Sequence, residues 1–250
     1  MVGRAWRYIT LDATGTLMRP AEATGETYLR FWEAVSGQSF SSSRRTALVT
    51  DLTARFPAEF NLQSQRRPNF GADGVATSAF PWWRDLVLTI MKEADVAVHA
   101  EKSERFTREL YAHFGRPEAW TVFADVRPAL DQLQTAGIRM GVISNFDERL
   151  EPLLDALGLR GYFDVVTTSF DQPHMKPHGS IFQSTFEQLQ GKESDVDASQ
   201  FLHVGDHFLR DYKAAQAVGA HARFVWRSTQ KSPPVDVQEA DVIPTLLQIE

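Results

Sequence analysis

The sequence predicts an α/β protein built on a doubly wound parallel sheet, with a helical domain inserted directly after the first strand. Two observations lead to this prediction. From residue 121 onward, short apolar runs alternate with segments of helical periodicity, a pattern typical of strands that lie parallel with helices on both faces. Between about residues 18 and 120 the apolar residues follow helical spacing and no strand alternation is visible.

Each strand expected in the sheet is short and ends in polar residues. The first is the apolar run before Asp12 in "YITLDATGTL", and the second is "GIRMGVISN". The others are "FDVVTTS", "QFLHVGD" and "ARFVW". Helices are expected between them in "DERLEPLLDALGL", "SIFQSTFEQLQG" and "RDYKAAQAVGA", where leucine, phenylalanine or alanine recur on one face.

The inserted region is expected to contain four amphipathic helices: "TYLRFWEAVSG", "RTALVTDLTARFPAEF", "FPWWRDLVLTIMKEA" and "ERFTRELYAHFG". The polar stretch "NLQSQRRPNFGADG" is expected to be a loop. We therefore expect a sheet domain of residues 1–17 and 121–250 and a helical domain of residues 18–120. The C-terminal "STQKSPPVDVQEADVIPTLLQIE" is expected to be a loop with one short element, without a functional role.

Composition excludes several classes of function. The 250 residues carry a formal charge of −6 and no basic run, which argues against a nucleic-acid surface. No cysteine is present, which excludes disulfides, thiolate metal sites and a cysteine nucleophile. No apolar stretch approaches the roughly 20 residues of a membrane-spanning helix. We expect a soluble, intracellular protein that binds neither nucleic acid nor membrane; its oligomeric state is not predicted.

Polar residues at the carboxyl ends of the predicted strands indicate where the site lies, because ligands of doubly wound sheets bind outside those ends. These residues are Asp12, Thr14 and Thr16 after the first strand, Ser144 and Asn145 after the second, Lys176 after the third, and Asp206 and Asp211 after the fourth. An aspartate can attack phosphorus or carbon as a nucleophile. Lys176 and the hydroxyls suit a phosphoryl group, and the carboxylates of Asp12 and Asp206 suit Mg²⁺, with Asp211 as support.

At these residues the chain resembles the haloacid dehalogenase superfamily. Its four motifs appear in order as "LDATGTL", "VISN", "KPHGSIF" and "HVGDHFLRD". The finer patterns "ISNFDERL", "GLRGYFDVVTTS" and "VGDHFLRDYKAAQAVGA" resemble the subgroup called haloacid dehalogenase-like hydrolase domain-containing protein 3. The resemblance implies a Rossmann-like core with an inserted helical cap that covers the site and selects a small phosphorylated, anionic substrate.

The resemblance also implies a role for each matched residue. Asp12 is implied to be the nucleophile and an Mg²⁺ ligand, and Thr14 occupies the acid/base position while its backbone carbonyl reaches the metal. Thr16 is implied to stabilise the turn and to lie near phosphate. Ser144, Asn145 and Lys176 are implied to bind phosphate, Asp206 to bind the metal, and Asp211 to support the metal site.

Thr14 departs from the family pattern, because phosphatases of this family carry an aspartate there that protonates the leaving group. A threonine hydroxyl does not ionise usefully near neutral pH, and the missing help is worth ~10²–10⁴-fold in rate. Three alternatives stay open: a slow or specialised phosphoester hydrolase, a non-catalytic or regulatory binding protein, and dehalogenase-type or phosphonate hydrolysis. The retained Asp206 and Asp211 favour phosphorus chemistry over halide release, and phosphonate chemistry would need a lysine from the insert, where only Lys92 and Lys102 occur.

Another titratable residue could replace the missing proton donor. Each candidate is, however, more typical of a surface or helix-capping position. These nominal candidates are His174, His178, His207, Asp147, Glu22 and Glu26. The insert's aromatic residues are expected to form its core, and Arg66 and Arg67 are expected to be solvated.

Overall fold

The chain divides into two compact units, described here from a computed structural model that covers residues 6–72, 76–193, 197–228 and 232–249. The first unit comprises residues 1–19, 122–146 and 150–250, and the second comprises residues 20–121 and 147–149. Parts of three predicted segments lie outside the described residues: the N-terminal residues 1–5, residues 73 and 74 of the polar stretch, and residues 229–231 and 250 near the C-terminus.

A six-stranded parallel sheet forms the centre of the first unit, which confirms the predicted fold class. Its order is β5-β4-β1-β6-β7-β8, with bounds Tyr8–Leu11 (β1), Arg139–Ser144 (β4), Val165–Thr168 (β5), Phe201–Gly205 (β6), His221–Val225 (β7) and Val242–Ile243 (β8). The central strand β1 pairs with β4 on one side and β6 on the other. The chain therefore winds outward in both directions from β1, and the switch point lies beside its carboxyl end.

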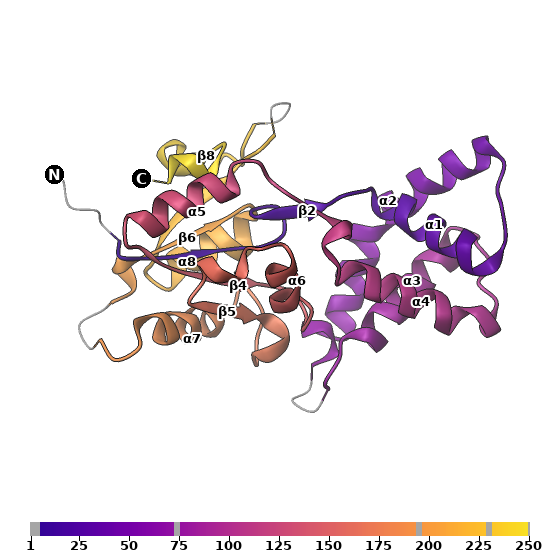
Figure 1. Ribbon diagram of the computed structural model, residues 1–250, viewed down its shortest axis with the longest axis horizontal. Coiled ribbons are helices and arrows are strands. Elements are labelled where there is room, and N and C mark those ends of the chain that lie inside the picture. The colour runs from indigo at the N-terminus through magenta and orange to yellow at the C-terminus, as the bar shows by residue number, and fades with distance from the viewer. Residues whose placement is uncertain (1–5, 73–75, 194–196, 229–231, 250) are drawn as a thin grey trace. The chain divides into compact units, whose positions relative to one another are not determined.

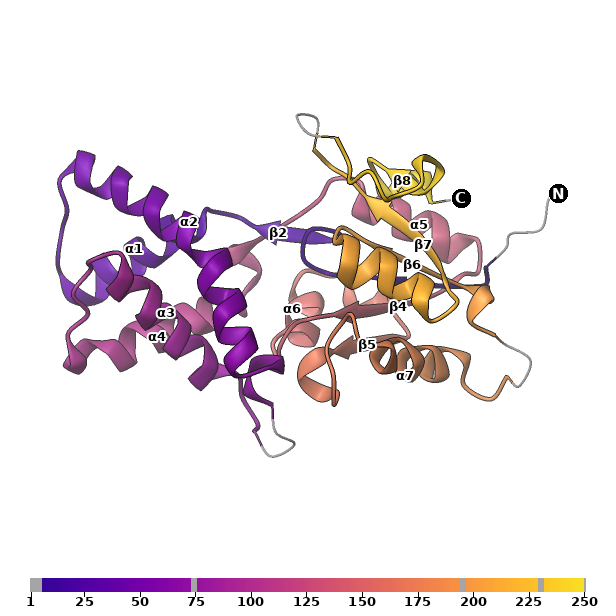
Figure 2. The same ribbon diagram turned by 180° about the vertical axis from the view of Figure 1, so that it is seen from behind.

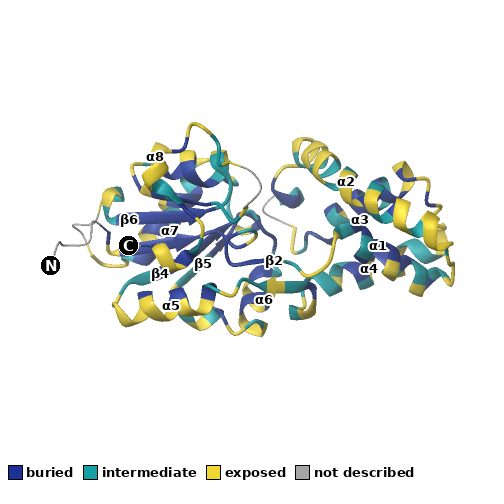
Figure 3. Ribbon diagram, turned by 90° about the horizontal axis from the view of Figure 1, so that it is seen from above, coloured by how far each residue is buried: buried dark blue, intermediate teal, exposed yellow. Residues whose placement is uncertain are grey.

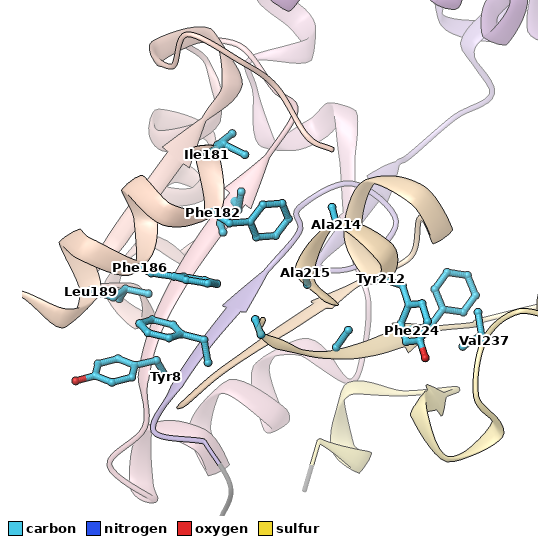
Figure 4. Close-up of a cluster of buried hydrophobic side chains, with 14 residues drawn as sticks. Tyr8, Ile181, Phe182, Phe186, Leu189, Tyr212, Ala214, Ala215, Phe224 and Val237 are labelled. Carbon is cyan, nitrogen blue, oxygen red and sulfur yellow. The ribbon is translucent and has the colours of Figure 1, made fainter. Parts of the chain in front are cut away.

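Helices cover both faces of this sheet. They are α5 (Val126–Thr135), α6 (Leu150–Ala156), α7 (Gly179–Gln190) and α8 (Ala214–Ala217), the last preceded by a π-helical turn over Phe208–Lys213. Figure 3 shows α5 and α8 on opposite sides of dark-blue, buried strands. Figure 4 shows the side chains Phe182, Phe186 and Leu189 of α7 lying over the sheet with Tyr8 of β1, in one apolar cluster.

Four helices make up most of the second unit: α1 (Thr24–Ser36), α2 (Ser42–Arg66), α3 (Phe80–Glu93) and α4 (Ala100–Phe114) (Figure 1). The tryptophans Trp32 and Trp82 are almost completely buried, as expected for core residues. The prediction of a loop after Phe60 is wrong for its first six residues, because α2 continues to Arg66. Gln63 on this last part of α2 donates to the carbonyl of Trp82 at 3.4 Å, and its neighbours are good helix formers.

Three short strands were also missed by the hydrophobic pattern. β2 (Met18–Pro20) and β3 (Trp120–Val122) pair in a two-stranded sheet where the chain passes between the units. β8 adds a sixth strand beside β7, and the C-terminal segment lies against α5 (Figures 1 and 2). Strands of two or three residues carry too few alternating side chains to be seen in a sequence.

Within the described ranges, no helix has both the length and the apolar character needed to cross a membrane.

Candidate active site

The turn after β1 places Asp12 at the switch point of the sheet. The amide of Asp12 donates to the carbonyl of Val204 at 2.9 Å, so the residue is still held between the central strands. The chain then turns back, with the amides of Leu17 and Met18 donating to the carbonyl of Ala13. Gly15 permits this turn because its φ of +87° is a conformation that side chains disfavour.

Lys176 lies beside Asp12 and is buried, with only 2% of its side chain exposed. Its ammonium donates to Asp12 Oδ1 at 2.8 Å, to Asp211 Oδ1 at 2.6 Å and to the carbonyl of Ile143 at 2.7 Å. A lysine ammonium has three N–H groups, so all of them are used. Burial alone would lower the pKa of Lys176, but the carboxylates of Asp12 and Asp211 outweigh it and raise that pKa. Lys176 is therefore a fixed positive charge beside Asp12.

Asp206 and Asp211 complete a carboxylate cluster with Asp12. One oxygen from each of the three lies within 4.8 Å of the others. Burial opposes ionisation of Asp211, yet Lys176 and His203 hold its pKa well below the ordinary value. Burial, followed by repulsion from Asp12 and Asp211, raises the pKa of Asp206 to about 7. The cluster has three carboxyl groups and one lysine, so its net charge favours a bound cation. Carboxylate oxygens are also the ligands that a hard cation such as Mg²⁺ prefers.

Glycines allow these carboxylates to approach the backbone. A Cβ at Gly15 would lie 2.1 Å from Asp206 Oδ2, and a Cβ at Gly205 would lie 2.3 Å from Asp211 Cγ. Real Cβ atoms essentially never approach this closely. The two glycines of "LDATGTL" and "HVGD" are therefore required by the cluster as well as by the chain path.

The predicted hydroxyl residues lie around the same strand ends with different exposures. Thr14 is exposed and bridges to Met18 through its backbone. Thr16 is fully buried, and its hydroxyl has no hydrogen-bond partner among the described residues. Ser144 is buried at the end of β4. The structure thus brings Thr16 and Ser144 to buried positions and leaves the side chain of Thr14 at the surface.

Asn145 contacts the backbone of the lysine loop. Its Nδ2 donates to the carbonyl of Lys176 at 2.9 Å, and its Oδ1 accepts from the amide of Lys176 at 2.8 Å. Both polar groups of the side chain are therefore occupied by the loop that carries Lys176. This geometry supports a positioning role for Asn145 rather than the direct phosphate contact that the motif implied.

His203 is a residue of this site that the sequence did not single out. It is fully buried in β6, where its Nδ1 lies 2.9 Å from the hydroxyl of Thr10 and its Nε2 lies 3.3 Å from Asp211 Oδ1. Burial lowers the pKa of His203, so the imidazole is neutral, with Nε2–H donating to the carboxylate and Nδ1 accepting from Thr10. A polar residue within the apolar run "QFLHVGD" was the available signal, because a buried polar group needs a partner.

The side chains suggested above as substitute proton donors contact residues outside the carboxylate cluster. Asp147 accepts from Trp83 at 2.7 Å and pairs with Arg149 inside the second unit. His207 accepts from the amide of Arg210 and begins the π-helical turn. The remaining contacts are Glu22 with Arg30, Glu26 with Arg45, and His178 with Ser180, while the rings of His174 and His178 lie 4.1 Å apart.

The four basic residues that the sequence singled out in the second unit are paired or exposed. Arg67 pairs with Asp85, Lys102 donates to the carbonyl of Ser36, and Lys92 and Arg66 are exposed. Neither of the two lysines of the insert, Lys92 and Lys102, is buried.

Comparison with known proteins identifies the family of the chain. Residues 6–219 match the family model described as haloacid dehalogenase-like hydrolase. The chain is similar to haloacid dehalogenase-like hydrolase domain-containing protein 3 of Homo sapiens, with 34% identity over 97% of this chain and 92% of that protein. It is also similar to phosphoglycolate phosphatase of Escherichia coli O157:H7, with 29% identity over 69% of this chain and 70% of that protein.

Solved structures share the fold at low sequence identity. The L-2-haloacid dehalogenase of Xanthobacter autotrophicus aligns with a TM-score of 0.68 and 16% identity, over 97% of this chain and 96% of that one. Phosphatases and dehalogenases are thus both among the similar proteins.

Proposed function

Because the chain belongs to the haloacid dehalogenase-like hydrolase family, we propose that it is an Mg²⁺-dependent phosphoester hydrolase with Asp12 as its nucleophile. Its substrate is a small phosphorylated, anionic molecule. The observation that carries the proposal is the cluster of Asp12, Asp206 and Asp211, in which Asp12 and Asp211 accept hydrogen bonds from the ammonium of Lys176. Halide release from carbon does not require carboxylates arranged to hold a cation, whereas phosphoryl transfer does.

The contacts of Asp12 favour Oδ2 as the attacking oxygen. Oδ1 accepts from Lys176, while Oδ2 accepts no hydrogen bond from the described residues. Oδ2 forms the bond to phosphorus as the bond to the leaving oxygen breaks, and the leaving group departs with the electron pair. A water then attacks the aspartyl phosphate, which releases phosphate and restores the carboxylate.

The residues around Asp12 hold the reactants in place. Lys176 fixes and neutralises the nucleophile, and the hydroxyls of Thr16 and Ser144 donate to the phosphoryl oxygens. Asp12, Asp206 and the backbone carbonyl of Thr14 would hold Mg²⁺, with Asp211 in support. When bound, the ion neutralises the charge that otherwise keeps an anionic nucleophile from an anionic substrate.

Thr14 limits the range of substrates. Its hydroxyl does not supply the proton that an alkoxide leaving group needs. The enzyme therefore favours phosphates whose leaving group departs as a stable anion, such as aryl or acyl phosphates. We further propose that residues 18–120 serve as the cap that selects the substrate, because nearly all of them form a separate, mostly helical unit inserted after the turn that carries Asp12.

Titration calorimetry tests the metal and phosphoryl sites together. Wild-type protein is titrated with beryllofluoride in the presence of Mg²⁺ and in EDTA, and hydrolysis of p-nitrophenyl phosphate is followed under the same two conditions. We expect Mg²⁺-dependent binding and turnover in the wild type. Asp12→Asn should lower turnover by at least ~10²-fold, since it removes the nucleophile.

Asp171→Asn is the matched control, because Asp171 follows β5 and accepts from Thr168 at 2.6 Å without joining the carboxylate cluster. Its activity should stay near that of the wild type. Absence of Mg²⁺-dependent mimic binding by the wild type refutes the proposal. Metal-independent halide release in a parallel screen of 2-haloacids indicates dehalogenase chemistry, while mimic binding without any turnover indicates a binding protein, the alternative that Thr14 favours.

A further inference from the structure

The C-terminal segment, to which the sequence assigned no role, is tied to the turn that carries Asp12 and Thr14. Three residues make this connection: Asp125 before α5, Arg227 after β7, and Thr245 after β8. All three lie in the first unit, as does the turn. Figures 1 and 2 show the C-terminal segment folded back beside α5.

Arg227 makes the contact with the turn. Its NH2 group donates to the backbone carbonyl of Thr16 at 2.9 Å, while its NH1 group lies 2.9 and 3.0 Å from the two oxygens of Asp125. The guanidinium also lies 4.0 Å from the centre of the Phe123 ring. The planar guanidinium is thus held by the carboxylate at one nitrogen and by the aromatic ring at its face. Its other terminal nitrogen contacts the turn.

Asp125 joins Arg227 to the C-terminal end of the chain. Besides the guanidinium, Oδ2 of Asp125 accepts from the hydroxyl of Thr245 at 2.8 Å and from the amide of Leu246 at 2.7 Å. Only 12% of the Asp125 side chain is exposed. A carboxylate with these donors has a single preferred position, and so fixes Arg227 in turn.

The turn itself depends on few backbone hydrogen bonds. The amides of Leu17 and Met18 donate to the carbonyl of Ala13, and the amide of Gly15 donates to the carbonyl of Met18 at 2.7 Å. The carbonyl of Thr16 takes no part in these bonds and accepts from the guanidinium of Arg227. Movement of Thr16 would shift both the carbonyl of Thr14 and the carboxylate of Asp12, which are on the same short loop.

We propose that Arg227 is a positioning residue for the catalytic turn, and that the C-terminal residues 242–249 act through Asp125 to hold it in place. The consequence for catalysis rests on the proposed function. The positioning itself does not, because it predicts the rigidity of the turn whatever reaction the site performs.

Hydrogen exchange resolved by residue tests the positioning. The variant is Arg227→Met, and the amides of Gly15, Leu17 and Met18 report on the turn. Losing a charge-assisted hydrogen bond at Thr16 should make these amides exchange about tenfold faster than in the wild type. The affinity for Mg²⁺ in the presence of beryllofluoride, measured by calorimetry, should fall in parallel.

Arg223→Met is a close control. Arg223 on β7 also pairs with one carboxylate, Asp241 at 2.6 Å, donates to one carbonyl, that of Ala222, and lies 5.3 Å from the centre of an aromatic ring, that of Trp6. The two arginine side chains are equally exposed, at 20%. Only Arg227 contacts the turn, so Arg223→Met should leave the exchange of the three amides unchanged.

The proposal is overturned if Arg227→Met leaves the turn as protected as in the wild type, or if both variants expose it equally. Should Arg227→Met not fold, Arg227→Lys replaces it, since lysine keeps the charge beside Asp125 but lacks the fork that reaches two partners. If the wild type binds no Mg²⁺-dependent mimic, the proposed function fails, and the exchange rates still decide the role of Arg227.

Discussion

Substitution of Gly15 by alanine should separate the carboxylate site from the stability of the fold. The new Cβ would lie 2.1 Å from Asp206 Oδ2, and contacts under 3.0 Å are essentially never seen. The carboxylate of Asp206 must therefore retreat by about 1 Å, a displacement that can cost ~10²-fold in rate. The φ of +87° adds a backbone cost of about 1–2 kcal/mol to the free energy of folding.

Gly137→Ala isolates the backbone cost. Gly137 has a similar φ of +72°, yet a Cβ there would have no atom within 4 Å. Urea unfolding should show that both variants lose about 1–2 kcal/mol of stability. Only Gly15→Ala should lose ~10²-fold of Mg²⁺-dependent hydrolysis of p-nitrophenyl phosphate. The reasoning is refuted if Gly15→Ala keeps activity within a few-fold of the wild type, or if Gly137→Ala loses as much.

Two further predictions concern residues at the ends and in the middle of the strands. Thr14→Asp should raise hydrolysis of alkyl phosphates, whose leaving groups need a proton, by ~10²–10⁴-fold; no gain in a folded variant, measured by phosphate release, would show that more than the proton donor is missing. Thr10→Val should leave Nδ1 of His203 without its donor and cost about 1–3 kcal/mol of stability, with weaker Mg²⁺-dependent mimic binding as Asp211 loses its orientation. Thr185→Val removes a comparable buried hydroxyl from α7, where it donates to the hydroxyl of Thr167 in β5. Equal loss of mimic binding in both variants would therefore argue against a specific role for His203.

The secondary structure of the sheet was predictable where strands and helices are long enough to show a period. β1, β4, β5 and β6 fall within the predicted runs, and α7 ends at Gln190 before Gly191, as its sequence indicates. The end of α2 was missed because its last turn has no apolar stripe and gains a contact with the carbonyl of Trp82. β2, β3 and β8 were missed because they are two or three residues long and exist through pairing with a partner strand.

The segment Asp147–Arg149 shows a different limit of sequence reading. It begins two residues after the predicted strand end at Ser144 and Asn145, and it falls within residues 121–250 of the expected sheet domain. Its contacts place it in the second unit, where Arg149 lies 3.7 Å from the centre of the Tyr111 ring and Asp147 accepts from Trp83. Adjacency along the chain does not determine which core a side chain joins.

The sequence by itself determined the fold class, the family and the set of polar residues at the strand ends, because these depend on local periodicity and on short motifs. Only the tertiary structure decided how those residues are used. In the structure, the ammonium of Lys176 donates to Asp12, to Asp211 and to the carbonyl of Ile143. Asn145 contacts the loop that carries Lys176. His203 contacts Asp211, and Arg227 contacts the turn after β1. The physical reason is that hydrogen bonds between residues far apart in the chain depend on distance and direction in space, which no local pattern encodes.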